Sequence, residues 1–205
     1  MNSFASYPTN LINGMKTMAN HNQYFKYLMH RSRLGKFYRK HWLYPRLCRH
    51  LKGRTLDIGC GIGDMLAFRP NTIGVDINRH TVDFCSERGF EAHLMELDVL
   101  PFRDSSFESA LLDNVLEHIP GPDSLLEEVY RILLPGGRLL VGVPGILGWK
   151  SDLDHKVFYD ELKISECVEK HGFLHINTFH TPIYRSSWLS NRLRQYCIYS
   201  VFQRV

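Results

Sequence analysis

The chain has 205 residues, of which 44% are hydrophobic and 22% are charged, a composition typical of one globular domain. No apolar run approaches the roughly 18 residues that cross a membrane, and the first residues lack the charged-then-apolar order of a signal peptide, so we expect a cytoplasmic protein. The five cysteines are widely spaced and form no CxxC pair, which argues against a disulfide framework or a zinc site.

The net charge of +4 conceals an uneven distribution of charge along the chain. Residues 1–56 contain eleven lysines and arginines and no acid, so the remaining residues carry fourteen cations against all 21 acids. This split predicts that the N-terminal segment either packs on the acidic remainder or meets an anionic partner. An apolar stripe that includes Phe25, Leu28 and Phe37 indicates that part of the segment is buried.

The predicted elements alternate between helices and strands through most of the chain. Residues 1–21 are expected to be mobile, and residues 22–205 to form a single domain with basic helices (22–53) before an α/β core (54–205). Pro45 either opens a second N-terminal helix or kinks the first. Strands are predicted at 54–58, 72–77, 92–97, 109–113, 138–143, 173–178 and 196–203, and helices at 65–68, 78–88, 123–133 and 160–170. This alternation predicts right-handed crossovers and a mostly parallel sheet covered on both faces.

Three glycines at alternate positions follow the first core strand in the segment LDIGCGIGDML, residues 56–66. At a strand-to-helix turn, glycine lets the backbone adopt positive φ and lets a ligand lie against bare main chain. A dinucleotide fingerprint, G-x-G-x-x-G, would need glycine at position 64, but Asp64 stands there and its charge would repel a pyrophosphate. The turn is therefore poorly suited to NAD or FAD.

Acidic residues end the first three predicted core strands, at Asp57, Asp76 and Asp98. Asp76 ends the second strand, a position from which a carboxylate can accept both hydroxyls of a ribose. Because the carboxyl ends of parallel strands share one edge of the sheet, the three carboxylates would lie along a common site. Such a site favours an adenosine ligand that carries positive charge.

Four segments carry a family resemblance: LDIGCGIGDML, GVDIN, ELDVLPFRDSSFESALLDNVLEHI and EEVYRILLPGGRLLVGVP. Together, over about residues 54–144, they resemble the class I S-adenosylmethionine-dependent methyltransferases, in particular the small-molecule group called type 11. The resemblance implies a Rossmann-like α/β sandwich with a mostly parallel seven-stranded sheet. It further implies that the last strand, 196–203, is antiparallel and lies beside the fifth, and that the cofactor is S-adenosyl-L-methionine.

The cofactor-binding residues that we expect lie at the ends of the first four core strands. They are Asp57, Gly59, Cys60, Gly61, Gly63, Asp76, Ile77, Asp98, Val99, Asp113 and Asn114. By the resemblance, the glycine turn and Asp113-Asn114 face the methionine portion, and Asp76 holds the ribose with Ile77 against the adenine. Asp98 would accept the adenine amino group, and Val99 would offer its backbone.

Methyl transfer requires little acid–base catalysis from the protein, because the sulfonium of the cofactor already activates the methyl group. A hydroxyl acceptor must nevertheless be aligned and must lose a proton. His155, in the loop after the fifth strand, is the first candidate for the base, because loops at that edge reach the methyl group. His118 is the second, and either histidine could instead only order a loop. The other histidines show no ligand spacing, and no metal is expected.

The acceptor is the least defined part of the prediction. YLMHRSRLGKFYRKHWLYPRL (27–47) and GVPGILGWKSDLDHKVFYD (142–160) resemble methyltransferases of polysaccharide and lipopolysaccharide assembly. Nucleotide-linked or lipid-linked sugars are anionic and would suit the basic segment, so we expect O-methylation of a small or carbohydrate-like acceptor. Peripheral membrane contact and the oligomeric state stay open.

Two alternatives belong to other functional classes. An RNA-modifying methyltransferase is compatible with the basic segment, but DNVL (113–116) stands where base-methylating relatives carry an NPPY-like tetrapeptide, so nucleic acid is not the expected partner. A non-catalytic cofactor-binding module of the same fold would have no physical need for acids at 57, 76 and 98 together.

Overall fold

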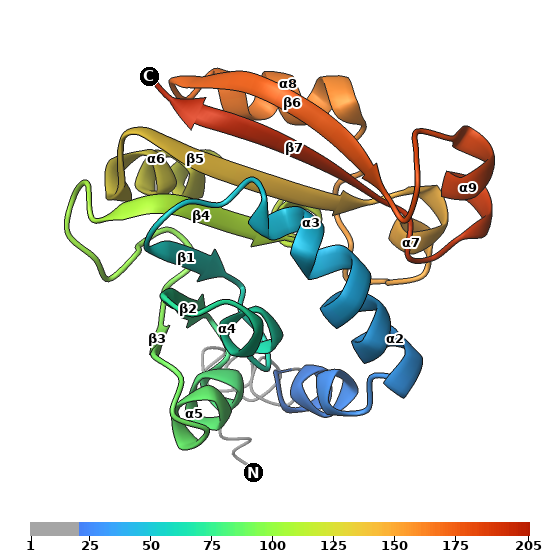
Figure 1. The fold of residues 1–205 in the computed structure, drawn as a ribbon, viewed down its shortest axis with the longest axis horizontal. Coiled ribbons are helices and arrows are strands. Elements are labelled where there is room, and N and C mark those ends of the chain that lie inside the picture. The colour runs from blue at the N-terminus through green and yellow to red at the C-terminus, as the bar shows by residue number, and fades with distance from the viewer. Residues whose placement is uncertain (1–20) are drawn as a thin grey trace, which may run out of the picture.

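The computed structural model describes residues 21–205, and its centre is a seven-stranded sheet of order β3-β2-β1-β4-β5-β7-β6 (Figure 1). The strands are β1 (Thr55–Ile58), β2 (Thr72–Asp76), β3 (Ala92–Leu94), β4 (Phe107–Asp113), β5 (Leu133–Pro144), β6 (Phe173–Thr181) and β7 (Cys197–Arg204). β1 to β5 pair in parallel, whereas β7 lies between β5 and β6 and is antiparallel to both. The predicted Rossmann-like sheet, with an antiparallel last strand beside the fifth, is confirmed.

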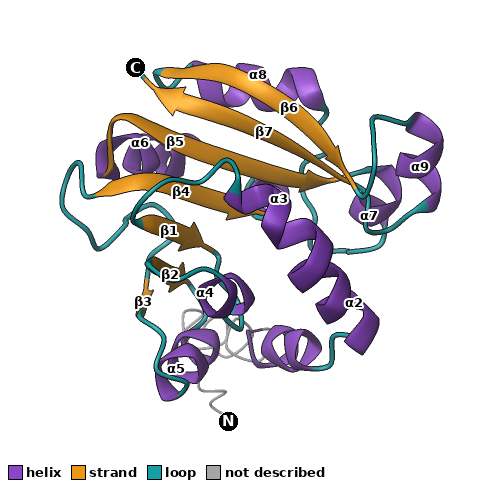
Figure 2. Cartoon of the chain, viewed as in Figure 1, coloured by secondary structure: helices purple, strands orange, loops and turns teal. Residues whose placement is uncertain are grey.

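Helices lie on both faces of this sheet (Figure 2). They are α2 (Arg33–Tyr38), η1 (Arg39–Leu43), α3 (Tyr44–Cys48), α4 (Asp64–Phe68), α5 (Arg79–Glu87), η2 (Leu116–His118), α6 (Asp123–Ile132), α7 (Ile146–Lys150), α8 (Glu161–Glu169) and α9 (Ser187–Arg192). Residues 21–29 are also helical. Within residues 21–205, none of the helices combines the length and the apolar character that crossing a membrane requires.

The two faces of the sheet bury different residues because successive side chains of a strand point to opposite sides. Leu111 of β4 packs in one buried cluster with Leu47 of α3. Its neighbour Leu112 packs in the other, with Val129 of α6. Each fully buried leucine contributes about 1.5–3 kcal/mol to folding, so both layers hold the sheet and fix the position of its carboxyl edge.

The basic N-terminal region continues from α2 through η1 into α3 without leaving the helical conformation. η1 is a π-helix, in which the N–H of Tyr44 donates to the carbonyl of Arg39, five residues earlier. Pro45, near the start of α3, has no N–H and cannot donate the hydrogen bond that an α-helix would need there. The π-helical turn therefore lies directly before the residue that interrupts the α-helical hydrogen bonds. Pro45 thus lies within one continuous helical segment, directly after its π turn, and not at the opening of a separate second helix.

The structure differs from the predicted elements mainly at short segments. α7 lies in a stretch predicted to be a loop, and α9 lies in a stretch for which no element was predicted. Both have five or six residues and contact each other: the N–H of Ile146 in α7 donates to Oγ of Ser190 in α9 at 2.9 Å. β3 ends at Leu94 rather than at residue 97, because the chain leaves the edge of the sheet there. The predicted mobility of residues 1–20 falls outside the described residues.

Candidate functional site

The turn between β1 and α4 is built on three glycines with positive φ. Gly59, Gly61 and Gly63 have φ of 75°, 53° and 75°, which side chains rarely adopt. The N–H of Gly61 donates to Oδ2 of Asp76 at 2.9 Å, and the N–H of Asn78 donates to Oδ1 at 2.8 Å. The turn and the acid at the end of β2 are thus held together at the carboxyl edge of the sheet.

A first cavity of about 320 Å³ opens beside this turn. Asp76 and Asn78 form part of its polar wall, whereas Ile77, Met95 and Leu97 contribute to its apolar wall. A ribose can place its hydroxyls on the carboxylate while a purine ring packs against the apolar side chains. The residues present therefore fit a nucleoside.

Two further cavities continue from the first. The second, of about 70 Å³, is lined by Asp57, Asp113 and the glycine turn, and the third, of about 430 Å³, lies under the N-terminal helices. Tyr24 and Asn114 line all three. The three spaces consequently meet at the end of β4, where a nucleoside, its polar tail and a separate acceptor can lie next to one another.

Asp57, Asp64 and Asp113 line the second cavity together with Arg31 and Arg39, which lie 3.3 Å from Asp64 and 3.5 Å from Asp113, so Asp57 is the carboxylate of this cavity that a cationic ligand would face. Burial raises the pKa of Asp57 well above its ordinary value, and the charges of Asp113 and Asp76 raise it further. Burial also raises the pKa of Asp76, against the hydrogen bonds from Asn78 and Gly61 that lower it. Because positive charge stabilises ionised carboxylates, the sulfonium and ammonium groups of S-adenosyl-L-methionine suit this cavity.

The third cavity is lined by cations from the N-terminal helices and from the segment before β7. Arg31, Arg39 and Arg194 are among its lining residues. Arg39 Nη1 lies 3.5 Å from Oδ2 of Asp113, and the hydroxyl of Tyr199 donates to Oδ1 of Asp113 at 2.7 Å. These contacts orient Asp113 and bring part of the basic segment directly over the carboxyl edge.

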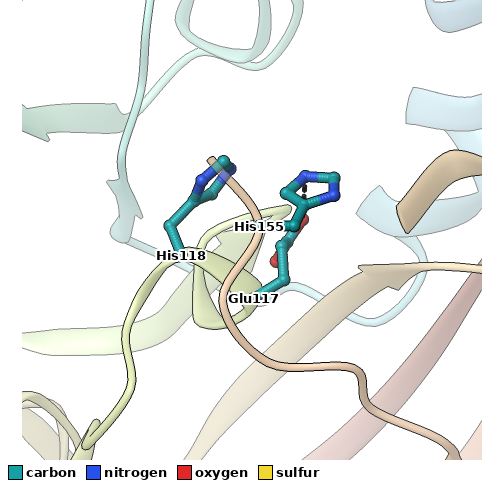
Figure 3. A group of neighbouring side chains, drawn as sticks. All are labelled: Glu117, His118 and His155. Atoms are coloured by element: carbon teal, nitrogen blue, oxygen red, sulfur yellow. Dashed lines mark ion pairs between the residues drawn. The ribbon is translucent and has the colours of Figure 1, made fainter. Parts of the chain in front are cut away.

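Figure 3 shows Glu117 and His118 of η2 beside His155, which belongs to the loop before α8. Nδ1 of His155 donates to the carbonyl of Trp149 at 2.8 Å, so a neutral ring keeps its lone pair on Nε2, which lies 3.9 Å from Oε1 of Glu117. The rings of His118 and His155 meet edge to face, with centroids 4.7 Å apart. Both histidines line the third cavity.

Glu117 is the least expected member of this group. It is fully buried, and among residues 21–205 neither of its carboxyl oxygens has a hydrogen-bond partner. Burial raises the pKa of Glu117 to about 8. Burial also lowers the pKa of His118, and the neighbouring His155 lowers it further.

The cavities gather most of the residues that were predicted from the sequence. Those that line at least one cavity are Asp57, Gly59, Cys60, Gly61, Asp76, Ile77, Asp113, Asn114, His118 and His155. Gly63 lies behind the turn, where an added Cβ would be 2.9 Å from Sγ of Cys85. Asp98 and Val99 are exposed and line none of the three cavities.

Sequence reasoning missed Met95, Leu97 and Glu117. Met95 and Leu97 lie in the wall of the first cavity, where Asp98 and Val99 were expected. Both residues were predicted to belong to a longer third strand, so their place in the cavity wall was not predicted. Glu117 precedes His118 in the motif NVLEHI, but nothing in the local sequence indicates that its carboxylate lies beside His155.

Comparison with known proteins agrees with this geometry. Residues 56–141 match the family model described as "Methyltransferase domain". A ubiquinone/menaquinone biosynthesis C-methyltransferase of Desulfotalea psychrophila is 32% identical over 42% of this chain and 39% of its own. A tRNA (carboxymethyluridine(34)-5-O)-methyltransferase of Mus musculus is 30% identical over 57% of this chain and 18% of its own. The chain spans less than half the length of the curated relatives that it matches.

Solved structures with the same fold cover the chain more completely. A protein of Thermotoga maritima, described as an S-adenosylmethionine-dependent methyltransferase and possible histamine N-methyltransferase, superposes with a TM-score of 0.74. The match covers 91% of this chain and 99% of that one, at 19% identity. The likeness establishes the shared fold over nearly the whole chain.

Proposed function

We propose that the protein transfers a methyl group from S-adenosyl-L-methionine to an oxygen of a small or carbohydrate-like acceptor. Residues 56–141 match the methyltransferase-domain family model, which supports the reaction type. The observation that carries this proposal is the meeting of three cavities at Asn114. The first fits adenosine, the second fits the methionine tail, and the third leaves room for an acceptor.

The cofactor assignment rests on chemistry that complements the residues present. Asp76 would hold the ribose and Ile77 would pack against the adenine, while Asp57 would face the cationic tail and Asp113 would line the same cavity. When bound, the cofactor supplies an electrophilic methyl group. The chain itself orients the two substrates and excludes water, for which the N-terminal helices over the third cavity are suited. Asp98 and Val99 are exposed, so a contact with the adenine would need this loop to move.

An anionic acceptor is supported by the cations at the third cavity. Arg31, Arg39 and Arg194 line it, and the opposing charges are Asp64 beside Arg31, Asp113 beside Arg39, and Asp152 in the cavity wall. Sugars linked to nucleotides or to lipid pyrophosphates carry phosphate groups that guanidinium side chains bind well. We therefore propose a cytoplasmic enzyme of polysaccharide biosynthesis.

His155 remains the first candidate for the proton acceptor, with His118 the second. The bond from Nδ1 to the carbonyl of Trp149 leaves Nε2 as the basic atom of the neutral ring, at the wall of the third cavity. An imidazole in this position can take the hydroxyl proton as the oxygen attacks the methyl group.

RNA is the second candidate acceptor, favoured by the similarity to the mouse tRNA methyltransferase and by the basic segment. A non-catalytic cofactor-binding module is the third possibility. A screen of acceptors with radiolabelled S-adenosyl-L-methionine separates these cases. Label transferred to nucleotide-linked or lipid-linked sugars supports the proposal, label found only in tRNA would replace the acceptor class, and cofactor binding without transfer to any acceptor would favour the module.

A further inference from the structure

We propose that Glu117, His118 and His155 form a binding site for one divalent transition-metal ion, at the wall of the third cavity (Figure 3). The site itself is independent of the proposed function, and only its role in methyl transfer rests on that function. The proposal replaces the expectation from the sequence that the site holds no metal.

The first observation is the convergence of three donor atoms from two separate segments. Each residue offers one ligand atom, and these atoms all lie within 4.8 Å of one another. Nε2 of His155 and Oε1 of Glu117 are 3.9 Å apart, too far for a hydrogen bond. Two ligands of a tetrahedral zinc ion, bonded at about 2.0–2.1 Å, lie roughly 3.4 Å apart. A small contraction would therefore bring both atoms into one coordination shell.

The second observation is the isolated carboxyl group of Glu117. It is fully buried, and the described part of the chain provides no hydrogen-bond partner for either oxygen. Native proteins rarely leave a buried polar group without a hydrogen-bond partner, and a bound ion is one of the standard reasons for such a group. A metal ion bound also to the two imidazoles would satisfy this carboxylate.

The third observation is the hydrogen bond that orients His155. Its Nδ1 donates to the carbonyl of Trp149 at 2.8 Å, which fixes the tautomer and leaves a lone pair on Nε2, the atom 3.9 Å from Oε1 of Glu117. Histidines that bind metals commonly donate their other ring N–H to a backbone carbonyl in this way. The backbone reinforces the arrangement, because the N–H of Lys156 donates to the carbonyl of Glu117 at 2.7 Å.

The donor set selects the kind of ion. Two imidazoles and one carboxylate, without a thiolate, suit zinc and its neighbours better than magnesium or calcium. Three protein ligands leave a fourth position open, as in catalytic rather than structural zinc sites. Because His118 and His155 line the third cavity, the open position would face the space assigned to the acceptor.

An ion in this position would change how the acceptor is activated. The acceptor hydroxyl would bind to the open position and release its proton to water, because coordination lowers the pKa of the hydroxyl. The bond between the cofactor sulfur and the methyl carbon then breaks as the new oxygen–carbon bond forms, and the sulfur keeps the electron pair. In this state Nε2 of His155 is a metal ligand and does not accept the proton. The charge of the ion makes the acceptor hydroxyl acidic enough to lose its proton to water.

Zinc binding to the full chain, measured after removal of metals with a chelator, tests the site directly. We expect one zinc per chain in calorimetric titration, with affinity reduced about 100-fold or more in Glu117→Gln and in His155→Ala. His93→Ala is the matched control, because His93 forms an exposed pair with Glu91 at 3.3 Å and should leave zinc binding unchanged. Stoichiometric binding by wild type that is equally strong in both site variants would overturn the proposal, as would no binding by wild type.

Thermal unfolding gives a second readout that does not depend on activity. Zinc at a concentration between the dissociation constants of wild type and Glu117→Gln should raise the midpoint of unfolding of wild type and His93→Ala, and should raise that of Glu117→Gln much less. An equal shift in Glu117→Gln would contradict the assignment. If zinc binds as expected but no acceptor is methylated, the proposed function fails and the metal site stands. If zinc does not bind and methyl transfer proceeds at full rate in the presence of a chelator, the metal site is wrong and the proposed function stands.

Discussion

The backbone N–H of Gly61 donates a hydrogen bond to Oδ2 of Asp76 at 2.9 Å, so the glycine turn after β1 and the acid that ends β2 form one unit. The second oxygen of the carboxylate accepts from the N–H of Asn78 at 2.8 Å. A ribose bound by Asp76 would therefore meet a carboxylate that two backbone donors already hold in place. This pre-organisation lowers the cost of ordering the site when the cofactor binds.

Gly59→Val should abolish cofactor binding while leaving a folded protein. A Cβ at this position would lie 2.8 Å from Cγ2 of Val115, in a backbone with φ of 75°, and the branched side chain would fill space at the junction of the first and second cavities. Calorimetry with S-adenosyl-L-methionine measures the loss, and circular dichroism checks the fold.

Gly89→Val is the matched control for this substitution. Gly89 also has positive φ, 79°, but an added Cβ would meet nothing within 4 Å. It therefore imposes similar backbone strain without entering the cavities, and its cofactor affinity should equal that of wild type. Normal binding by Gly59→Val would remove the turn from the cofactor site.

Asp57→Asn should stabilise the cofactor-free protein, increasingly so as the pH rises above about 4. Burial raises the pKa of Asp57 in the folded state, with a further contribution from Asp113 and Asp76. Between the unfolded pKa, near 3.9, and the raised folded pKa, the folded state binds more protons than the unfolded state. Its stability therefore falls as the pH rises, by up to about 1.4 kcal/mol per pH unit.

The difference between Asp57→Asn and wild type isolates this contribution, because other titrating groups are shared. Urea unfolding at several pH values without cofactor gives the free energy of unfolding of both proteins. Parallel pH profiles would show that the carboxyl group of Asp57 ionises normally in the folded protein.

The positions of most strands along the chain and the glycine turn could be predicted because their signals are local, whereas the place of the last strand beside the fifth was implied by the family resemblance. Alternation of apolar runs with turn residues indicates β1, β2 and β4, and three glycines after a strand mark the turn. α7 and α9 were not predicted, because helices of five or six residues gain their stability from packing. α4 is equally short, but the glycine turn before it marks its start.

The site residues also divide into those that local sequence patterns locate and those that depend on the three-dimensional path of the chain. Asp76 lies at a strand end, which the sequence periodicity locates, and it lines the first cavity as expected. Asp98 was placed by the same rule on a strand that ends earlier, at Leu94, so its side chain is exposed. The meeting of Glu117 with His155 depends on the path of the long loop after β5, which no local pattern records.

His155→Ala should lower turnover by roughly 10² to 10⁴ while leaving cofactor affinity nearly unchanged, because its side chain lines the third cavity and not the first or second. Single-turnover rates at saturating acceptor, with calorimetry for the cofactor, separate the two effects. His93→Ala should retain full turnover. A variant with near-normal maximal rate and a higher KM for the acceptor would assign His155 to loop positioning only.

Arg194→Gln should raise the KM for a phosphate-bearing acceptor by roughly 10-fold to 100-fold, the range expected for one hydrogen bond to a charged group. Arg194 lines the third cavity and donates to the hydroxyl of Tyr27 at 3.1 Å. Arg192→Gln is the control, because the Arg192 guanidinium packs over the ring of Trp188 and lines none of the three cavities. Equal KM values for the two variants would argue against an anionic acceptor.

The binding of S-adenosyl-L-methionine to wild type and to Asp76→Ala, measured by calorimetry, tests the central claim most directly. The account predicts one site per chain in wild type and an affinity lower by about 1–3 kcal/mol in Asp76→Ala, the scale of losing hydrogen bonds to a charged group. Absence of binding heat from wild type, or equal affinity in the two proteins, would contradict it.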